Sequence, residues 1–258
     1  MLRRFFEGDS GPVGHAADGM VGEPIAALDN RGAVGRGQVH LAFELGGKRI
    51  RYAYIRKNGC SAFKTAMGFA HDVRIGLIEP YQRCGLLRRR YHATIFVWRD
   101  PLERIVSLYR KKIIDDVNSE DIRRRLRAFA GGGRIDFDRF VDFCCRAGDP
   151  HCLPQAAHLK PIRYTHAIPL ARLHEAMTGI VGPEAAAPFA QRVNQSRQTP
   201  IMISDTSREH IRHHYSQDYR LIEQIRAAHP CERRLGPKQE THHPGIVEVT
   251  DASCRAIR

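Results

Sequence analysis

Residues 54–67, YIRKNGCSAFKTAM, hold several groups that can bind a phosphate-like anion. After an apolar, strand-like stretch, Lys57, Gly59 and Ser61 precede an apolar-spaced helix that also carries Lys64. Backbone N–H groups at a tight turn and the positive end of a helix attract anions, and the lysines and hydroxyl add charge and donors. The nucleotide-triphosphate signature G-x-x-x-x-G-K-[ST] is absent, so the stretch indicates either another anion or an ordinary strand-to-helix turn.

A second stretch, FVWRDPLERIVSLYRKK at residues 96–112, adds another set of anion-binding groups. Arg99 falls at the carboxyl end of a predicted strand, which is where open α/β sheets bind ligands, and Ser107 lies two turns into the following helix. An arginine fork with a nearby hydroxyl suits a phosphate dianion. Arg99 could instead pair only with Asp100 or Glu103.

Taken together, the two stretches resemble the donor-binding motifs of the sulfotransferases. RKNGCSAFK is similar to their 5′-phosphosulfate loop, and VWRDPLERIVSLY is similar to their 3′-phosphate motif. The resemblance is closest to carbohydrate sulfotransferases of the chondroitin 4-O-sulfotransferase type, because FDRFVDF and DPHCLPQ resemble their F-x-x-F-V and D-x-H-x-x-P-Q segments. VNQS and IRHHYSQDYRLIEQI resemble their Asn-x-Ser element and their closing helix with a Tyr-x-x-Asp-Tyr pattern. Cys152 departs from the family, which has an aromatic residue there, and the interval from Lys57 to Arg99 is short.

The resemblance implies a donor, an acceptor and a fold. The donor would be 3′-phosphoadenosine 5′-phosphosulfate (PAPS), which leaves as 3′-phosphoadenosine 5′-phosphate (PAP), and the acceptor a hydroxyl of a carbohydrate or glycoconjugate. The fold would be α/β, a P-loop-NTPase-like three-layer arrangement with a central parallel sheet flanked by helices. We expect no metal, because a sulfuryl group carries less negative charge than a phosphoryl group and protein cations can do what Mg²⁺ does in kinases.

The same resemblance assigns roles to the residues of both motifs. Lys57 would neutralise the bridging oxygen as its bond to sulfur breaks. Ser61 and Lys64 would hold the 5′-phosphate, and Arg99 and Ser107 the 3′-phosphate. The residues expected to bind the donor are Lys57, Asn58, Gly59, Cys60, Ser61, Ala62, Lys64, Arg99 and Ser107.

A general base must accept the proton of the acceptor hydroxyl. His151 is the first candidate, because it lies in the family-like DPHCLPQ segment and histidine titrates near neutrality. It could equally be a structural histidine that bonds loop backbone. Glu79 is the second candidate, because some sulfotransferases have a catalytic glutamate at a comparable distance after the lysine loop, although Glu79 could simply end a strand. His71 and His92 are further alternatives.

Composition limits the classes of protein that fit. The chain has 258 residues, 42% of them hydrophobic, and a formal net charge of +13, so one domain that attracts a polyanion is expected. A basic nucleic-acid-binding protein and a P-loop-type kinase are the alternatives. The first would leave the two anion motifs unexplained, and we expect no stable nucleic-acid partner. The second is disfavoured because the sequence shows neither the second glycine followed by Gly-Lys nor a clear metal-binding acidic partner. The basic runs LLRRRYH, YRKKI and IRRRLRAF are predicted to be solvated helix faces.

Cellular location and redox state follow from the apolar runs and the cysteines. Apolar runs stay far below the roughly 20 residues that cross a bilayer, so the sequence predicts a soluble, cytoplasmic protein without a membrane span. Seven cysteines without paired C-x-x-C spacing are expected to be reduced thiols. Cys144, Cys145, His151 and Cys152 could form a metal site, but their spacing is not that of a structural zinc site.

The pattern of elements predicts one sulfotransferase-like domain over residues 39–228. A Gly-rich extension over 1–38, loop or disordered, precedes it, and a loosely held tail over 229–258 follows it. VHLAFEL-GG-KRIRYAYI predicts a hairpin, HATIFVW a strand, DFDRFVDFCCRA a helix, and the alternation of strands with helices a parallel sheet. Asp100 is predicted to cap a helix that begins at Pro101. A capping box at Thr206 and Glu209 predicts the start of a later helix.

Overall fold

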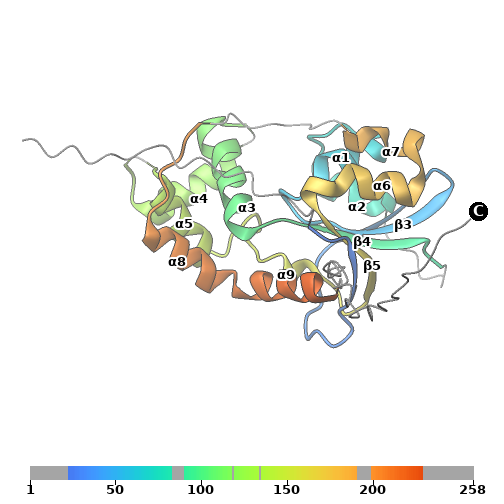
Figure 1. Cartoon of the computed structure of the whole chain (residues 1–258). Helices are drawn as coiled ribbons and strands as arrows, with labels where there is room; N and C mark the ends of the chain where they lie inside the picture. Colours follow the sequence, from blue (N-terminus) through green and yellow to red (C-terminus); the bar gives the residue numbers. More distant parts are fainter. Residues whose placement is uncertain (1–22, 83–89, 118, 134, 191–198, 229–258) are drawn as a thin grey trace, which may run out of the picture.

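The computed structural model describes residues 23–82, 90–117, 119–133, 135–190 and 199–228. They form an α/β architecture in which helices cover both faces of a five-stranded sheet (Figure 1). The strands lie in the order β1-β5-β4-β3-β2. Their bounds are Ala26–Asp29 (β1), His40–Leu45 (β2), Lys48–Ala53 (β3), Ala93–Trp98 (β4) and Arg163–Pro169 (β5). The predicted tail over 229–258 and the VNQS element lie outside the described residues.

The sheet is mixed, whereas the alternation of strands with helices predicted a parallel one. β3, β4 and β5 run parallel in the centre, whereas β1 and β2 are antiparallel to their neighbours at the two edges. β2 joins β3 through Gly46 and Gly47, whose φ angles are 55° and 68°. A two-residue turn with two positive φ angles joins only antiparallel strands. The predicted hairpin is confirmed.

Strand β1 lies inside the segment that was predicted to be loop or disordered. It pairs with β5, and its Ala26 and Leu28 are 8% and 7% exposed. The prediction is therefore wrong for these residues, and structured chain precedes residue 39. A four-residue edge strand with only two inward apolar side chains gives too short an alternation to be distinguished from loop.

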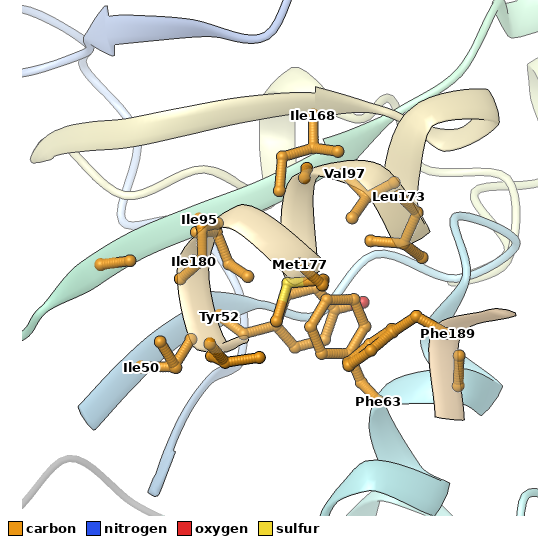
Figure 2. Packing of buried hydrophobic residues seen from close by; sticks show 14 of the residues in the cluster. Ile50, Tyr52, Phe63, Ile95, Val97, Ile168, Leu173, Met177, Ile180 and Phe189 are labelled. Carbon is orange, nitrogen blue, oxygen red and sulfur yellow. The ribbon is translucent and has the colours of Figure 1, made fainter. Parts of the chain in front are cut away.

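One face of the sheet is covered by α1 (Cys60–Ala66), α2 (Ile75–Gln82), α6 (Leu173–Val181) and α7 (Pro183–Ala190). The ring of Phe63, in α1, stacks on Tyr52 of β3 at 3.7 Å between centroids and meets Phe189 of α7 edge-on at 4.9 Å. Figure 2 shows these rings together with Met177 of α6. This aromatic packing fixes α1, and the loop before it, against the sheet.

The opposite face is covered by α9 (Ser216–Ala228), which buries Leu221, Ile222 and Ile225. Alternate residues of β4 point to the two faces, and all six of its residues are buried. A central strand that is buried on both sides reads as a continuous apolar run. The strand predicted from HATIFVW is thus confirmed.

A third apolar cluster joins α3 (Pro101–Tyr109), α4 (Glu120–Ala130), α5 (Phe137–Arg146) and α8 (Asp205–His214) beside the sheet (Figure 1). The predicted cap of α3 is confirmed, because the backbone N–H of Glu103 donates to Asp100 Oδ1 at 3.0 Å. The helix predicted from DFDRFVDFCCRA is α5, which is capped by Asp136.

The capping box predicted at Thr206 and Glu209 is wrong. The N-cap of α8 is Ser204, whose hydroxyl accepts the backbone N–H of Ser207 at 3.1 Å. The chain also turns at Tyr215, so the single helix expected there is two helices, α8 and α9. Tyr215 is fully buried and its hydroxyl donates to the carbonyl of Cys152 at 2.7 Å, a tertiary contact that helical spacing cannot show.

Three short helices complete the fold: the π-helix η1 (Arg110–Ile114) and the 3₁₀ turns η2 (Ala156–His158) and η3 (Leu170–Arg172). Within the described ranges, no helix combines the length and apolar character needed to span a membrane. Nor do any three His, Cys, Asp or Glu side chains of these ranges group as metal ligands. Cys144 and Cys152 are buried free thiols with their sulfur atoms 3.0 Å apart.

Candidate functional site

The turn between β3 and α1 carries the first predicted anion motif. Two residues of this turn have left-handed backbone, Lys57 with φ 70° and Gly59 with φ 75°. A Cβ at Gly59 would lie 2.8 Å from Leu173 Cδ2, so this position requires glycine. A lysine at positive φ is strained, and such strain persists where the surrounding structure enforces it, often at functional sites. Because α1 has only seven residues, the site depends on the turn and its cations more than on a helix dipole.

Lys57 is the electrostatic centre of this region. Burial lowers the pKa of Lys57 to about 8, and the charges of Lys111, Lys112 and Arg99 lower it further, while Cys60 opposes the shift. Of the charged side chains with the largest effects on this pKa, three are cations, and all three lower it. The two predicted anion motifs therefore lie within electrostatic range of each other, and a cluster of cations of this kind favours a bound anion.

Lys111 and Lys112 were missed as site residues, because YRKKI was predicted to be a solvated helix face. Both are half-buried and lie in η1, the π-helical turn that continues α3. A π-turn holds one more residue than an α-turn, so it changes the direction of the side chains that follow. Burial lowers the pKa of Lys112, and the charges of Lys111 and Arg56 lower it further. Helical spacing could not have predicted this position.

A buried hydrogen-bond network joins the two anion motifs. The side-chain carbonyl of Gln155 accepts from Asn58 Nδ2 at 2.5 Å and from the backbone N–H of Arg99 at 3.0 Å. Its amide nitrogen donates to the carbonyl of Arg99 at 2.8 Å. Asn58 also donates to the carbonyl of Val97 at 2.8 Å. The turn that carries Lys57 and the end of β4 are thereby tied to one amide group.

Asp218 of α9 extends the same hydrogen-bond network. Its carboxylate accepts the backbone N–H groups of Gln155 at 2.8 Å and Ala156 at 2.9 Å. Burial raises the pKa of Asp218, and these hydrogen bonds oppose the rise, as does the charge of Arg104. Gln155 and Asp218 belong to the DPHCLPQ and Tyr-x-x-Asp-Tyr segments, which explains why those segments accompany the anion motifs in this chain.

His151 forms a dyad with Asp149. Its Nδ1 lies 2.8 Å from Asp149 Oδ1, and Arg125 Nη1 donates to Asp149 Oδ2 at 3.2 Å. The Asp149 side chain is 3% exposed and that of His151 is 30% exposed. Burial opposes ionisation of Asp149, but the hydrogen bonds from His151 and the charge of Arg125 outweigh it, so the pKa of Asp149 is lowered. Asp149 therefore holds the proton on Nδ1, which leaves Nε2 as the proton acceptor.

The dyad lies beside the cation cluster. Arg104 donates to the backbone carbonyls of both Arg56 and His151, at 3.2 and 3.3 Å. The charge of Asp149 also raises the pKa of Lys112, against the larger effects that lower it. The structure thus brings together Lys57, Arg99 and His151, as the candidate site requires.

The other residues predicted to bind the donor differ in their accessibility. Arg99 pairs through Nε with Glu103 at 3.1 Å, the alternative that the sequence left open, and its side chain is 25% exposed. Ser61 and Ser107 are half-buried, as are Gly59 and Cys60. Lys64 is 7% exposed, and its ammonium donates to the carbonyl of Val73 at 2.6 Å, while Ala62 is also buried. Because both side chains are buried, neither Lys64 nor Ala62 is exposed for direct contact with a donor at the surface.

The remaining candidate bases are Glu79, His71 and His92. Glu79 lies in α2, so it does not end a strand, and its side chain is outside the described part of the structure. His71 is exposed in the turn before α2. The backbone N–H of His92 donates to the carbonyl of Arg49 at the start of the parallel pair β3–β4. Among the candidates whose side chains the structure describes, His151 is the one with a hydrogen bond to an orienting carboxylate.

Comparison with known proteins gives a match to one family model, over the central part of the chain. Residues 45–169 match the family model described as "Sulfotransferase family". The matched segment runs from the β2–β3 hairpin to the end of β5, so it includes Lys57, Arg99, His151 and Gln155. No curated protein and no solved structure gives a significant match.

The lowered pKa of Lys57 predicts that anion binding weakens at alkaline pH. In the free protein the pKa of Lys57 is about 8, and a bound anion raises it. The affinity for the anion therefore falls as the pH rises from the pKa of the free protein to that of the complex. We expect the association constant for PAP, measured by calorimetry, to fall by up to about tenfold per pH unit above about pH 8. Lys57→Arg keeps its charge throughout this range and should show a flatter profile. Parallel profiles for the two proteins would contradict the assignment.

Proposed function

We propose that the chain is a sulfotransferase that transfers a sulfuryl group from PAPS to a hydroxyl of a carbohydrate or glycoconjugate, and the match of residues 45–169 to the sulfotransferase family model supports this proposal. The observation that carries this proposal is the convergence of Lys57 and Arg99 beside the Asp149–His151 dyad. We also propose that the mixed sheet and its two helical layers are a P-loop-like fold. Nucleic-acid binding or a P-loop kinase would leave the dyad without a role.

The donor would be held at its two anionic ends. Ser61 and the left-handed turn would bind the 5′-phosphosulfate, and Lys57 would approach the oxygen that bridges phosphorus and sulfur. Arg99, with the two terminal nitrogens that its pair with Glu103 does not use, would bind the 3′-phosphate together with Ser107. Lys64 would act at longer range, since its ammonium already bonds the carbonyl of Val73.

The transfer would be an in-line displacement at sulfur. The acceptor oxygen forms a bond to sulfur while the bond from sulfur to the bridging oxygen breaks, and PAP leaves with the negative charge. Lys57 stabilises that charge. His151 Nε2 takes the proton of the acceptor hydroxyl, and Asp149 stabilises the imidazolium that results. Glu79 remains the second candidate for this base.

The acceptor is proposed at the level of its chemical class only. A net charge of +13 would attract a polyanionic donor and also an acidic glycan. We propose that the reaction needs neither a metal nor a nucleic-acid partner, and that the protein acts in the cytoplasm.

Donor specificity can be tested by thermal shift with PAP, AMP and ATP. A ligand at about 100 times its Kd stabilises the folded state by about 2.7 kcal/mol, which corresponds to a rise in Tm of roughly 5–10 °C for a protein of this size. We expect such a rise with PAP and a much smaller one with AMP, because AMP lacks the 3′-phosphate that Arg99 would bind. Equal or greater stabilisation by ATP would contradict the proposal and favour a kinase.

The identity of the base can be tested with matched amide variants. His151→Gln is expected to lower kcat by about 10²–10⁴-fold, the usual range for loss of a general base, while the Kd for PAP changes little. Glu79→Gln, the matched control, should retain activity close to that of the unmodified protein. Full activity of His151→Gln together with a large loss in Glu79→Gln would assign the base to Glu79 instead.

A further inference from the structure

Arg104 is a buried cation to which neither anion motif gives a role. It lies in α3, one turn after Asp100, and is 1% exposed. Its Nε donates to the carbonyl of Arg56 at 3.2 Å, and its Nη2 donates to the carbonyl of His151 at 3.3 Å. Its third nitrogen, Nη1, is buried without a hydrogen-bond partner among the described residues.

The hydrogen bonds of Arg104 do not neutralise its charge, because they go to backbone carbonyls and not to a carboxylate. Arginine stays protonated in proteins, so the charge must be buried with the side chain. The only acceptors that the structure gives Arg104 within the described chain are two neutral backbone carbonyls. Burying a charge costs several kcal/mol unless the ion is paired through hydrogen bonds. The charge of Arg104 acts on the buried Asp218, but the hydrogen bonds of Arg104 go to the two carbonyls and not to that carboxylate. Its neighbours in α3, Ile105 and Leu108, are buried apolar residues.

The two carbonyls that Arg104 joins belong to the two sides of the proposed reaction. Arg56 immediately precedes Lys57, which would stabilise the leaving oxygen, and His151 would activate the attacking oxygen. No other described side chain donates to both of these carbonyls. A guanidinium is planar and its donors have fixed relative directions, so it holds two acceptors at a defined separation. A lysine ammonium on a flexible stem cannot impose that separation.

We propose that Arg104 is a positioning residue that sets the distance between Lys57 and the His151 imidazole. The inference rests on the proposed sulfuryl transfer, in which the leaving and attacking oxygens lie in line on opposite sides of sulfur. A misplacement of about 1 Å in such a geometry can lower the rate by about 10²-fold. PAP would contact Lys57 but not His151. Its affinity should therefore depend much less than the rate on the distance between these two residues.

The kinetic test uses Arg104→Lys, which keeps the charge and removes the fork. Arg226→Lys is the control, because Arg226 makes a comparable two-nitrogen contact with Glu23 on the exposed side of α9. We expect Arg104→Lys to lower kcat by about 10–100-fold, with the Kd for PAP within about threefold of the unmodified value. A kcat within threefold would overturn the proposal. So would a Kd that weakens by the same factor as kcat, because this would mean a general collapse of the site.

A second measurement separates this inference from the proposed function. Hydrogen–deuterium exchange of Arg104→Gln should be faster in residues 55–60 and in residues 149–153, with exchange in β4 unchanged. If the unmodified protein transfers no sulfuryl group, the proposed function fails, yet the exchange experiment still tests whether Arg104 holds both loops. Unchanged exchange in either loop, or faster exchange throughout the protein, would overturn the positioning role.

Discussion

The candidate site depends on one buried amide, the side chain of Gln155. A buried amide is stable only when its oxygen and its nitrogen are both hydrogen-bonded. Gln155 meets this requirement through Asn58 in the turn after β3 and through the backbone of Arg99 at the end of β4. Neither segment can move without breaking a buried hydrogen bond, so the two anion motifs keep a fixed relation.

The cations of the site oppose folding, and the surrounding core offsets their cost. Lys57, Lys111, Lys112 and Arg99 repel one another, and burial makes the charge of Lys57 less favourable. The aromatic contacts of Phe63 with Tyr52 and the apolar packing of α6 hold α1 and its turn in place despite this repulsion. Functional sites commonly accept such a local conflict, which the rest of the structure compensates. A bound polyanion would relieve it.

Much of the fold follows from local sequence patterns. The two glycines at 46 and 47 require positive φ and thus indicate the β2–β3 hairpin, and Asp100 followed by proline indicates the start of α3. The antiparallel pairing of β1 with β5 was not predicted, because a short edge strand such as β1 carries little periodic signal. The break between α8 and α9 depends on Tyr215 reaching Cys152, a contact between distant segments that local patterns do not contain.

The sequence predicted several residues of the candidate site but not the hydrogen bonds that join them. Lys57, Arg99 and His151 could be selected by residue type and motif, and the structure places all three near one another. Lys111 and Lys112 were missed because the π-turn changes their direction. The link through Arg104 was missed because an arginine in an amphipathic helix is ordinarily solvated, and burial is a property of the whole fold.

The most direct test of this account is the affinity of Gln155→Leu for PAP, measured by calorimetry at one pH and ionic strength. The substitution keeps a similar volume but leaves Asn58 and the backbone of Arg99 without their shared partner. Each buried polar group left unsatisfied costs about 1–3 kcal/mol, so the two segments are expected to shift until these groups regain partners. Because that shift separates the two anion motifs, we predict about a tenfold loss of affinity or more in a variant that remains folded by circular dichroism. A folded Gln155→Leu that binds PAP as tightly as the unmodified protein would contradict the account.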